Sequence, residues 1–137
     1  MKALLIIAHG SRRVESNAEI RALADKVAQQ AGGRYGVVGC AFLELAEPSI
    51  SAGIQQCIDQ GADDITIMPF FLSAGRHVVE DVPAQVHSKQ DEYPQITMHI
   101  APYLGVSPLM PALILQASDI ACACRGASCQ YPTCLAR

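Results

Sequence analysis

Charged residues are scarce in this chain of 137 residues, and they form no basic cluster. They make up 17% of the sequence, whereas half of the residues are apolar, and this composition excludes an intrinsically disordered protein. The formal net charge is −3. Without a Lys/Arg cluster, that charge argues against a general nucleic-acid-binding protein. The length predicts one globular domain.

Long apolar runs are also missing. No run approaches the roughly 18 residues that a membrane-spanning helix needs, so we expect no membrane partner. The apolar run at residues 3–8 leads straight into His9 and has no small-residue cleavage site after it, which makes it a poor signal peptide. We therefore expect a cytoplasmic protein.

Several catalytic and nucleotide-binding motifs are absent. The chain has neither a Walker A pattern nor a G-x-G-x-x-G pattern, so nothing in it supports nucleotide binding. Ser11 does not lie in a G-x-S-x-G setting, which disfavours a serine hydrolase. Any chemistry must therefore come from another set of residues.

Short apolar runs and amphipathic segments alternate four times along the chain. We expect strands at residues 2–8, 37–43, 64–72 and 95–101. We expect helices at residues 15–31, 48–61, 76–90 and 108–120, with Pro48 opening the second and Pro83 in the first turns of the third or kinking it. The alternation predicts right-handed βαβ crossovers. The fold class is thus α/β, with a four-stranded parallel sheet covered by helices on both faces, like half of a flavodoxin fold. The domain would span residues 1–120, followed by a tail at 121–137.

Polar residues follow the expected strands. His9 follows the first strand, Glu44 and Glu47 follow the second, and Ser73 and His77 follow the third. Ligands of open α/β sheets bind outside the carboxyl ends of the strands. The sequence therefore predicts that these polar residues gather at one edge of the sheet.

The two histidines are candidate metal ligands. A lone histidine at a strand end is best explained as a helix cap or as a partner of a backbone carbonyl. A second one at the equivalent junction favours a shared role for His9 and His77, because two neutral imidazoles bind a borderline ion such as Co²⁺, Fe²⁺ or Ni²⁺. Glu44 is the expected acid in the cleft, as proton acceptor or third ligand, although a solvated loop acid is the alternative. Glu47 fits the first turn of a helix.

Four residues near the histidines suit an anionic ligand. Ser11, Arg12, Ser73 and Gly75 offer hydroxyls, a guanidinium group and N–H groups close to helix N-termini. Ordinary helix capping is the alternative for each of them.

Cysteines are concentrated in the tail. Cys122, Cys124, Cys129 and Cys134 follow a C-x-C-x4-C-x4-C spacing, whereas the remaining two, Cys40 and Cys57, are expected to be buried thiols. Four thiolates can hold zinc or an iron–sulfur cluster, yet this spacing matches neither a C-x2-C zinc pair nor a standard ferredoxin run. The alternative is a flexible end whose thiols oxidise or scavenge metal.

Four motifs resemble one family. They are residues 8–12 (AHGSR), 42–44 (FLE) with 48–50 (PSI), 69–77 (PFFLSAGRH) with 81–83 (DVP), and 101–105 (APYLG). Together they resemble the CbiX/SirB family of class II tetrapyrrole chelatases, over about residues 1–120. The cysteine tail departs from the single-domain pattern, which ends before it.

The resemblance implies a chelatase-like fold and an enzyme that inserts cobalt, iron or nickel into sirohydrochlorin without a nucleotide, for cobalamin or siroheme biosynthesis. It implies that His9 and His77 bind the metal and that Glu44 is their acidic partner. A chain this short resembles the single-domain members, which form homodimers. The alternative is a non-catalytic metal carrier or sensor, which would bind metal in stoichiometric amounts and have no affinity for a tetrapyrrole. A third possibility, an inert structural domain, would make the clustering of two histidines and a glutamate a coincidence.

Overall fold

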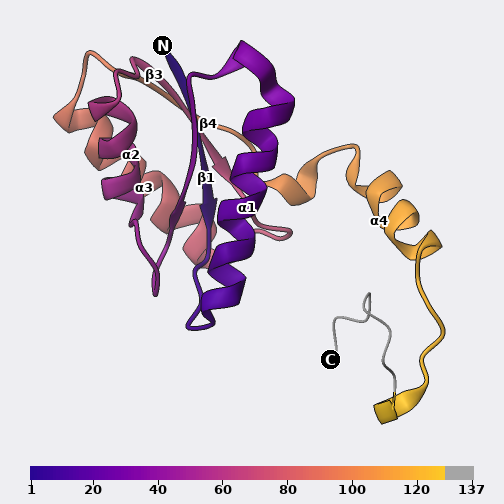
Figure 1. Ribbon diagram of the computed structural model, residues 1–137. Coiled ribbons are helices and arrows are strands. Elements are labelled where there is room, and N and C mark those ends of the chain that lie inside the picture. Colours follow the sequence, from indigo (N-terminus) through magenta and orange to yellow (C-terminus); the bar gives the residue numbers. More distant parts are fainter. Residues whose placement is uncertain (129–137) are drawn as a thin grey trace. The chain divides into compact units, whose positions relative to one another are not determined.

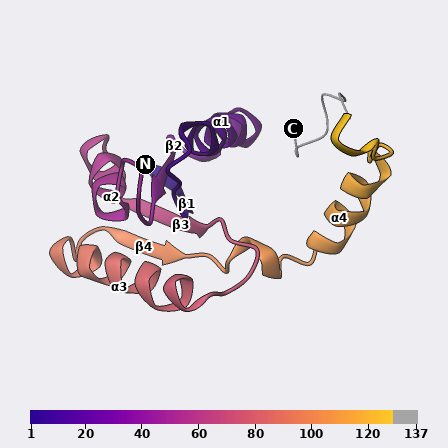
Figure 2. The ribbon, with the colours of Figure 1, turned by 90° about the horizontal axis from the view of Figure 1, so that it is seen from below.

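The sheet has four strands, and all neighbouring strands run parallel. The computed structural model describes residues 1–128, except for the side chain of His77. The strands are β1 (Lys2–Ala8), β2 (Val37–Phe42), β3 (Asp64–Pro69) and β4 (Thr97–Ile100). They form one sheet (Figure 1), and their order across it is β2-β1-β3-β4, as Figure 2 shows. The predicted α/β fold with a parallel sheet is confirmed.

Three helices cover the sheet, and they lie on both of its faces. They are α1 (Val14–Ala31), α2 (Ile50–Asp59) and α3 (Arg76–Glu92). Helix α1 packs on one face, whereas α2 and α3 contact each other on the opposite face (Figure 2). Because β2 and β3 flank β1 on opposite sides, right-handed crossovers must place α1 and α2 on different faces. The predicted two-sided covering is also confirmed.

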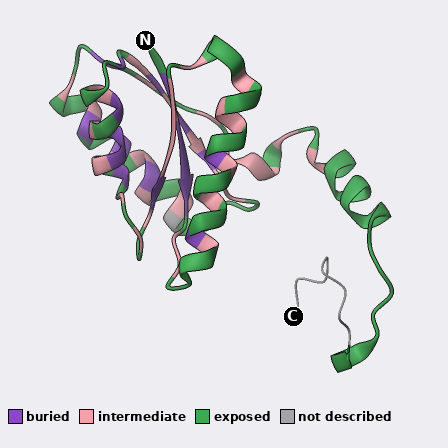
Figure 3. Ribbon diagram, viewed as in Figure 1, coloured by how far each residue is buried: buried purple, intermediate pink, exposed green. Residues whose placement is uncertain are grey.

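The main core lies between the sheet and the α2–α3 layer. Alternate residues of a strand point to the same face, and Leu5, Ile7, Ile65 and Ile67 are at most 2% exposed. They pack with apolar residues of the two helices, among them Ile50, Ile54, Cys57, Val82 and Val86. Figure 3 shows buried segments along the strands and the inner sides of these helices. Burial of such a side chain contributes about 1.5–3 kcal/mol, so this core positions the strand ends firmly.

The prediction that Pro48 opens a helix is wrong, whereas Pro83 lies within the third helix, as predicted. Pro48 does not open a helix, because α2 begins at Ile50 and the Ser49 hydroxyl oxygen accepts a hydrogen bond from the Ala52 N–H at 3.2 Å. Serine provides this side-chain cap, which proline cannot. Pro83 lies inside α3, beyond its first turn, where it lacks the N–H that would bond to the carbonyl of Val79.

The chain divides after Val106 into two compact units, Met1–Val106 and Ser107–Arg137. The second unit contains α4 (Met110–Asp119), whose side chains are almost all exposed. The predicted functional division, a domain of residues 1–120 and a tail of residues 121–137, stays a prediction. Within residues 1–128, no helix is long and apolar enough to cross a membrane.

Candidate functional site

The carboxyl ends of β1 and β2 bring His9 and Glu44 together. The two strands end in register, with Ala8 opposite Phe42. Their pairing continues beyond the strands, because the Leu43 N–H donates to the Ala8 carbonyl at 2.9 Å and the Glu44 N–H donates to the His9 carbonyl at 3.1 Å. The edge location that the sequence predicts for these two residues follows directly from this parallel register.

The side chains of His9 and Glu44 face each other. Nε2 of the imidazole lies 3.5 Å from Oε1 of the carboxylate, and the two side chains are 55% and 59% exposed. The ring of Phe71 meets the imidazole edge to face, with 6.2 Å between the ring centroids and an interplanar angle of 82°. The imidazole is thus held on two sides while staying open to solvent. A histidine in this setting can serve as a metal ligand or as a proton acceptor.

Glycine at position 10 permits this close approach. Gly10 has a φ of 92°, a left-handed conformation that L side chains rarely adopt. A Cβ atom at this position would overlap the backbone carbonyl of Glu44. The loops after β1 and β2 therefore lie against each other only because residue 10 has no side chain.

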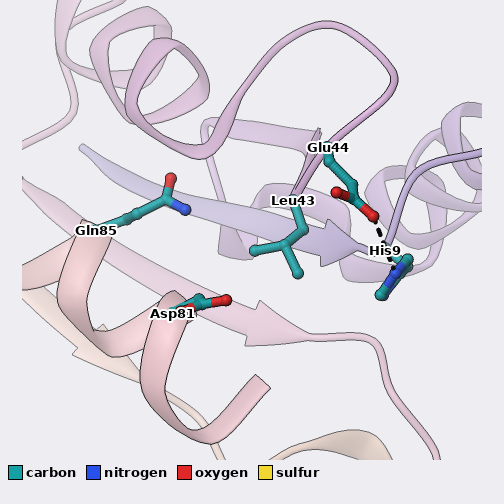
Figure 4. A pocket seen from close by; sticks show the side chains of 5 residues that line it. All are labelled: His9, Leu43, Glu44, Asp81 and Gln85. Atoms are coloured by element: carbon teal, nitrogen blue, oxygen red, sulfur yellow. Dashed lines mark ion pairs between the residues drawn. The ribbon is translucent and has the colours of Figure 1, made fainter. Parts of the chain in front are cut away.

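A cavity of about 200 Å³ opens beside the pair. His9, Leu43 and Glu44 line one side, and Asp81 and Gln85 of α3 line the other (Figure 4). Sequence reasoning missed Asp81 and Gln85 as site residues. Their spacing of four residues places them on one face of a helix, which is the signal that could have found them.

A second cavity, of about 300 Å³, lies at the start of α1 and includes His9, Ser11 and Asn17 in its lining. The Ser11 N–H donates to Asn17 Oδ1 at 3.0 Å, and Asn17 Nδ2 donates to the Ser11 carbonyl at 2.8 Å. The Ser11 hydroxyl oxygen accepts from the Arg13 N–H at 3.0 Å. The backbone N–H of Ser11 is therefore already used within the turn, and the hydroxyl proton is the donor that Ser11 can offer to a ligand.

The other candidate substrate-binding residues lie on the loops of the same edge. Arg12 and Ser73 are exposed, in the segments that follow β1 and β3. Gly75 is the N-cap residue of α3, and its carbonyl accepts hydrogen bonds from the Val78 and Val79 N–H groups at 3.1 Å each. Their role in binding a substrate stays a prediction.

The structure describes the side chain of only one of the two predicted metal ligands, His9. His77 is the second residue of α3, and its side chain lies outside the described residues, so its pairing with His9 stays a prediction. Among the side chains that the structure does describe, no group of three or more His, Cys, Asp or Glu residues is placed to hold a metal ion.

The cysteines fall into two groups. Cys57 is buried, as predicted, and burial raises the pKa of its thiol to about 11. Cys40 is only half-buried, and burial raises the pKa of its thiol while the nearby Arg21 charge opposes that shift. In the tail, Cys122 and Cys124 are exposed. Cys129 and Cys134 lie outside the described residues, so a zinc or iron–sulfur site on the tail stays a prediction.

Comparison with known protein families and sequences finds metal chelatases. The family model CbiX matches residues 3–121. The chain is 37% identical over 112 residues to the chloroplastic sirohydrochlorin ferrochelatase of Arabidopsis thaliana, an alignment that covers 82% of this chain and 47% of the relative. It is 32% identical over 93 residues to the sirohydrochlorin cobaltochelatase of Methanocaldococcus jannaschii, covering 68% of this chain and 64% of the relative. The chain thus spans less than two thirds of each relative.

Solved structures with the same fold are also known. A cobalamin (vitamin B12) biosynthesis CbiX protein from Marinobacter aquaeolei VT8 has a TM-score of 0.74 and 28% identity, covering 87% of this chain and 95% of that one. The sirohydrochlorin chelatase SirB from Bacillus subtilis subspecies spizizenii, in complex with cobalt, has a TM-score of 0.75 and 29% identity. That match covers 88% of this chain and 51% of the SirB chain.

Proposed function

The chain belongs to the CbiX family, and we propose that it is a sirohydrochlorin metallochelatase. One structural observation carries the proposal: the exposed His9–Glu44 pair stands at the carboxyl edge of the sheet, beside a cavity. The names of the relatives, which include both ferrochelatases and cobaltochelatases, support the same reaction class. They support Co²⁺ and Fe²⁺ as substrate ions and favour neither, and Ni²⁺ stays a prediction. Cobalamin or siroheme biosynthesis is the pathway we expect the enzyme to serve.

The reaction releases two protons. A divalent ion enters the macrocycle, and two pyrrole N–H groups lose their protons as the metal–nitrogen bonds form. An imidazole nitrogen can coordinate a metal ion or accept a proton, so His9 is suited to either role. The Glu44 carboxylate, 3.5 Å from the imidazole, balances the positive charge in either case. His77 would complete the site as the second metal-binding imidazole.

The size of the cavity indicates which substrate it takes. Its volume of about 200 Å³ is below the roughly 300–1,000 Å³ of pockets that enclose a drug-sized ligand. We infer that this cavity receives the ion and that the macrocycle lies across the open edge of the sheet. We expect Ser11, Arg12, Ser73 and Gly75 to donate hydrogen bonds there to the carboxylates of an anionic tetrapyrrole.

The wild-type protein tests this function directly. It is mixed without oxygen with sirohydrochlorin and either Co²⁺ or Fe²⁺, and the absorbance of the pigment is followed over time. A chelatase converts the pigment spectrum faster than the same mixture without protein. A metal carrier or sensor instead binds the ion in stoichiometric amount and leaves the pigment spectrum unchanged, and that result would contradict the proposal.

We also propose that the chain forms a homodimer. Large apolar side chains in and next to α4 are between 53% and 77% exposed: Leu109, Leu113, Ile114, Leu115 and Ile120. Exposed apolar patches of this kind mark interaction surfaces. A cytoplasmic location stays a prediction.

The double variant Leu113→Lys/Ile114→Lys is expected to convert the dimer into a monomer, because two charges would have to be buried in the interface. Sedimentation velocity measures the change in mass. The control is Val14→Lys, at a side chain that is 72% exposed on α1 and should leave the mass unchanged. A monomeric wild type, or a double variant that stays dimeric, would refute this interface.

A further inference from the structure

The loop of residues 43–48 carries Glu44 and is closed at its base. The Phe42 N–H donates to the Pro48 carbonyl at 2.9 Å, and Phe42 forms a parallel bridge with Ser49. The backbone N–H of Glu44 donates to the carbonyl of His9, directly after β1, as described above. Between these two attachments, Leu45 adopts a φ of 66°, a left-handed conformation that is costly for a residue other than glycine. A loop of this kind needs further contacts to keep one conformation.

Arg21 of α1 supplies such a contact. Its Nη2 atom donates a hydrogen bond of 2.9 Å to the carbonyl of Glu47, near the far end of the loop. Its Cζ atom lies 5.2 Å from the centroid of the Phe42 ring, and Phe42 is only 1% exposed. The guanidinium group thus lies over the ring of a buried aromatic residue at the end of β2, while one of its N–H groups bonds to the loop.

We propose that Arg21 is a positioning residue for the His9–Glu44 pair, an inference that rests on the function proposed for that pair. Arg21 forms no hydrogen bond or ion pair with the side chain of His9 or Glu44. It acts through Glu47, three residues after Glu44, so that the loop is held from the α1 side as well as from the β1 side. Lysine cannot replace it, because an ammonium group has neither the plane that stacks on a ring nor the fixed direction of the N–H donor.

The test compares Arg21→Gln and Arg21→Lys with a matched control, Arg34→Gln. Arg34 also stacks on an aromatic ring, with Cζ 5.9 Å from the centroid of Tyr35, but it lies in the turn after α1. Two quantities are measured: the NMR signals of the His9 imidazole in the metal-free protein, and the rate of metal insertion. The insertion assay separates kcat from KM.

Both Arg21 variants should move the His9 ring signals and lower kcat about fivefold, the cost of losing one exposed, charge-assisted hydrogen bond. Arg34→Gln should change neither quantity. If the Arg21 variants match Arg34→Gln in ring signals and in rate, the positioning role is refuted. The NMR measurement needs neither metal nor tetrapyrrole, so a wild type that inserts no metal would refute the proposed function separately.

Discussion

Replacing His9 with alanine is expected to slow metal insertion about a hundredfold while the fold stays intact. In the proposed function the imidazole binds the ion or accepts a proton, and a positioned acid–base group contributes about 10²–10⁴-fold to a rate. The side chain is 55% exposed, so its removal takes little packing from the core. The rate is measured by pigment absorbance, and the free energy of unfolding is measured by urea denaturation.

The control for this experiment is His99→Ala. His99 of β4 forms a similar pair, with Nε2 3.4 Å from Oδ1 of Asp64 and a side chain that is 57% exposed. Asp64 is the first residue of β3, so this pair lies away from the carboxyl edge. His99→Ala should insert metal at the wild-type rate. A His9→Ala variant as fast as wild type, or a His99→Ala variant as slow as His9→Ala, would show that the roles are assigned wrongly. His77→Ala should be as slow as His9→Ala if the two imidazoles share one ion.

Replacing Gly10 with alanine is expected to lower both stability and activity. The new Cβ atom would overlap the Glu44 carbonyl, and the φ of 92° is strained for alanine. The free energy of unfolding should fall by about 2–4 kcal/mol, since strain and overlap add. The loops relieve the overlap by moving apart, which takes Glu44 away from His9. A displacement of about 1 Å in a catalytic group can cost about a hundredfold in rate.

The matched control is Gly33→Ala, since a Cβ atom at position 33 has no neighbouring atom within 4 Å. Gly33→Ala should unfold in urea close to the wild-type midpoint and insert metal at the wild-type rate. Equal stability and equal rates for the two variants would mean that the close contact between residues 10 and 44 has no energetic consequence.

Local patterns in the sequence were enough to predict the elements and the edge on which the site lies. Apolar periodicity depends on neighbours within one or two turns, so the four strands and four α-helices found within residues 1–128 were predicted, with ends that differ by a few residues. Because parallel strands end at a common edge, the positions of His9 and Glu44 directly after two strands also predicted that they would lie on that edge. The prediction that Pro48 opens a helix was wrong because Ser49, the next residue, is the N-cap of α2 and its side chain accepts a hydrogen bond there.

The contacts that make the site depend on residues far apart in the chain, which no local pattern specifies. The 3.5 Å approach of His9 to Glu44, and the need for glycine at position 10, arise from the register between β1 and β2. The second wall of the cavity, Asp81 and Gln85, is set by the packing of α3 on the sheet. A sequence pattern predicts which side of a helix or strand is buried. Only the packing of the core determines which buried sides contact each other, and therefore which side chains face one another across the cavity.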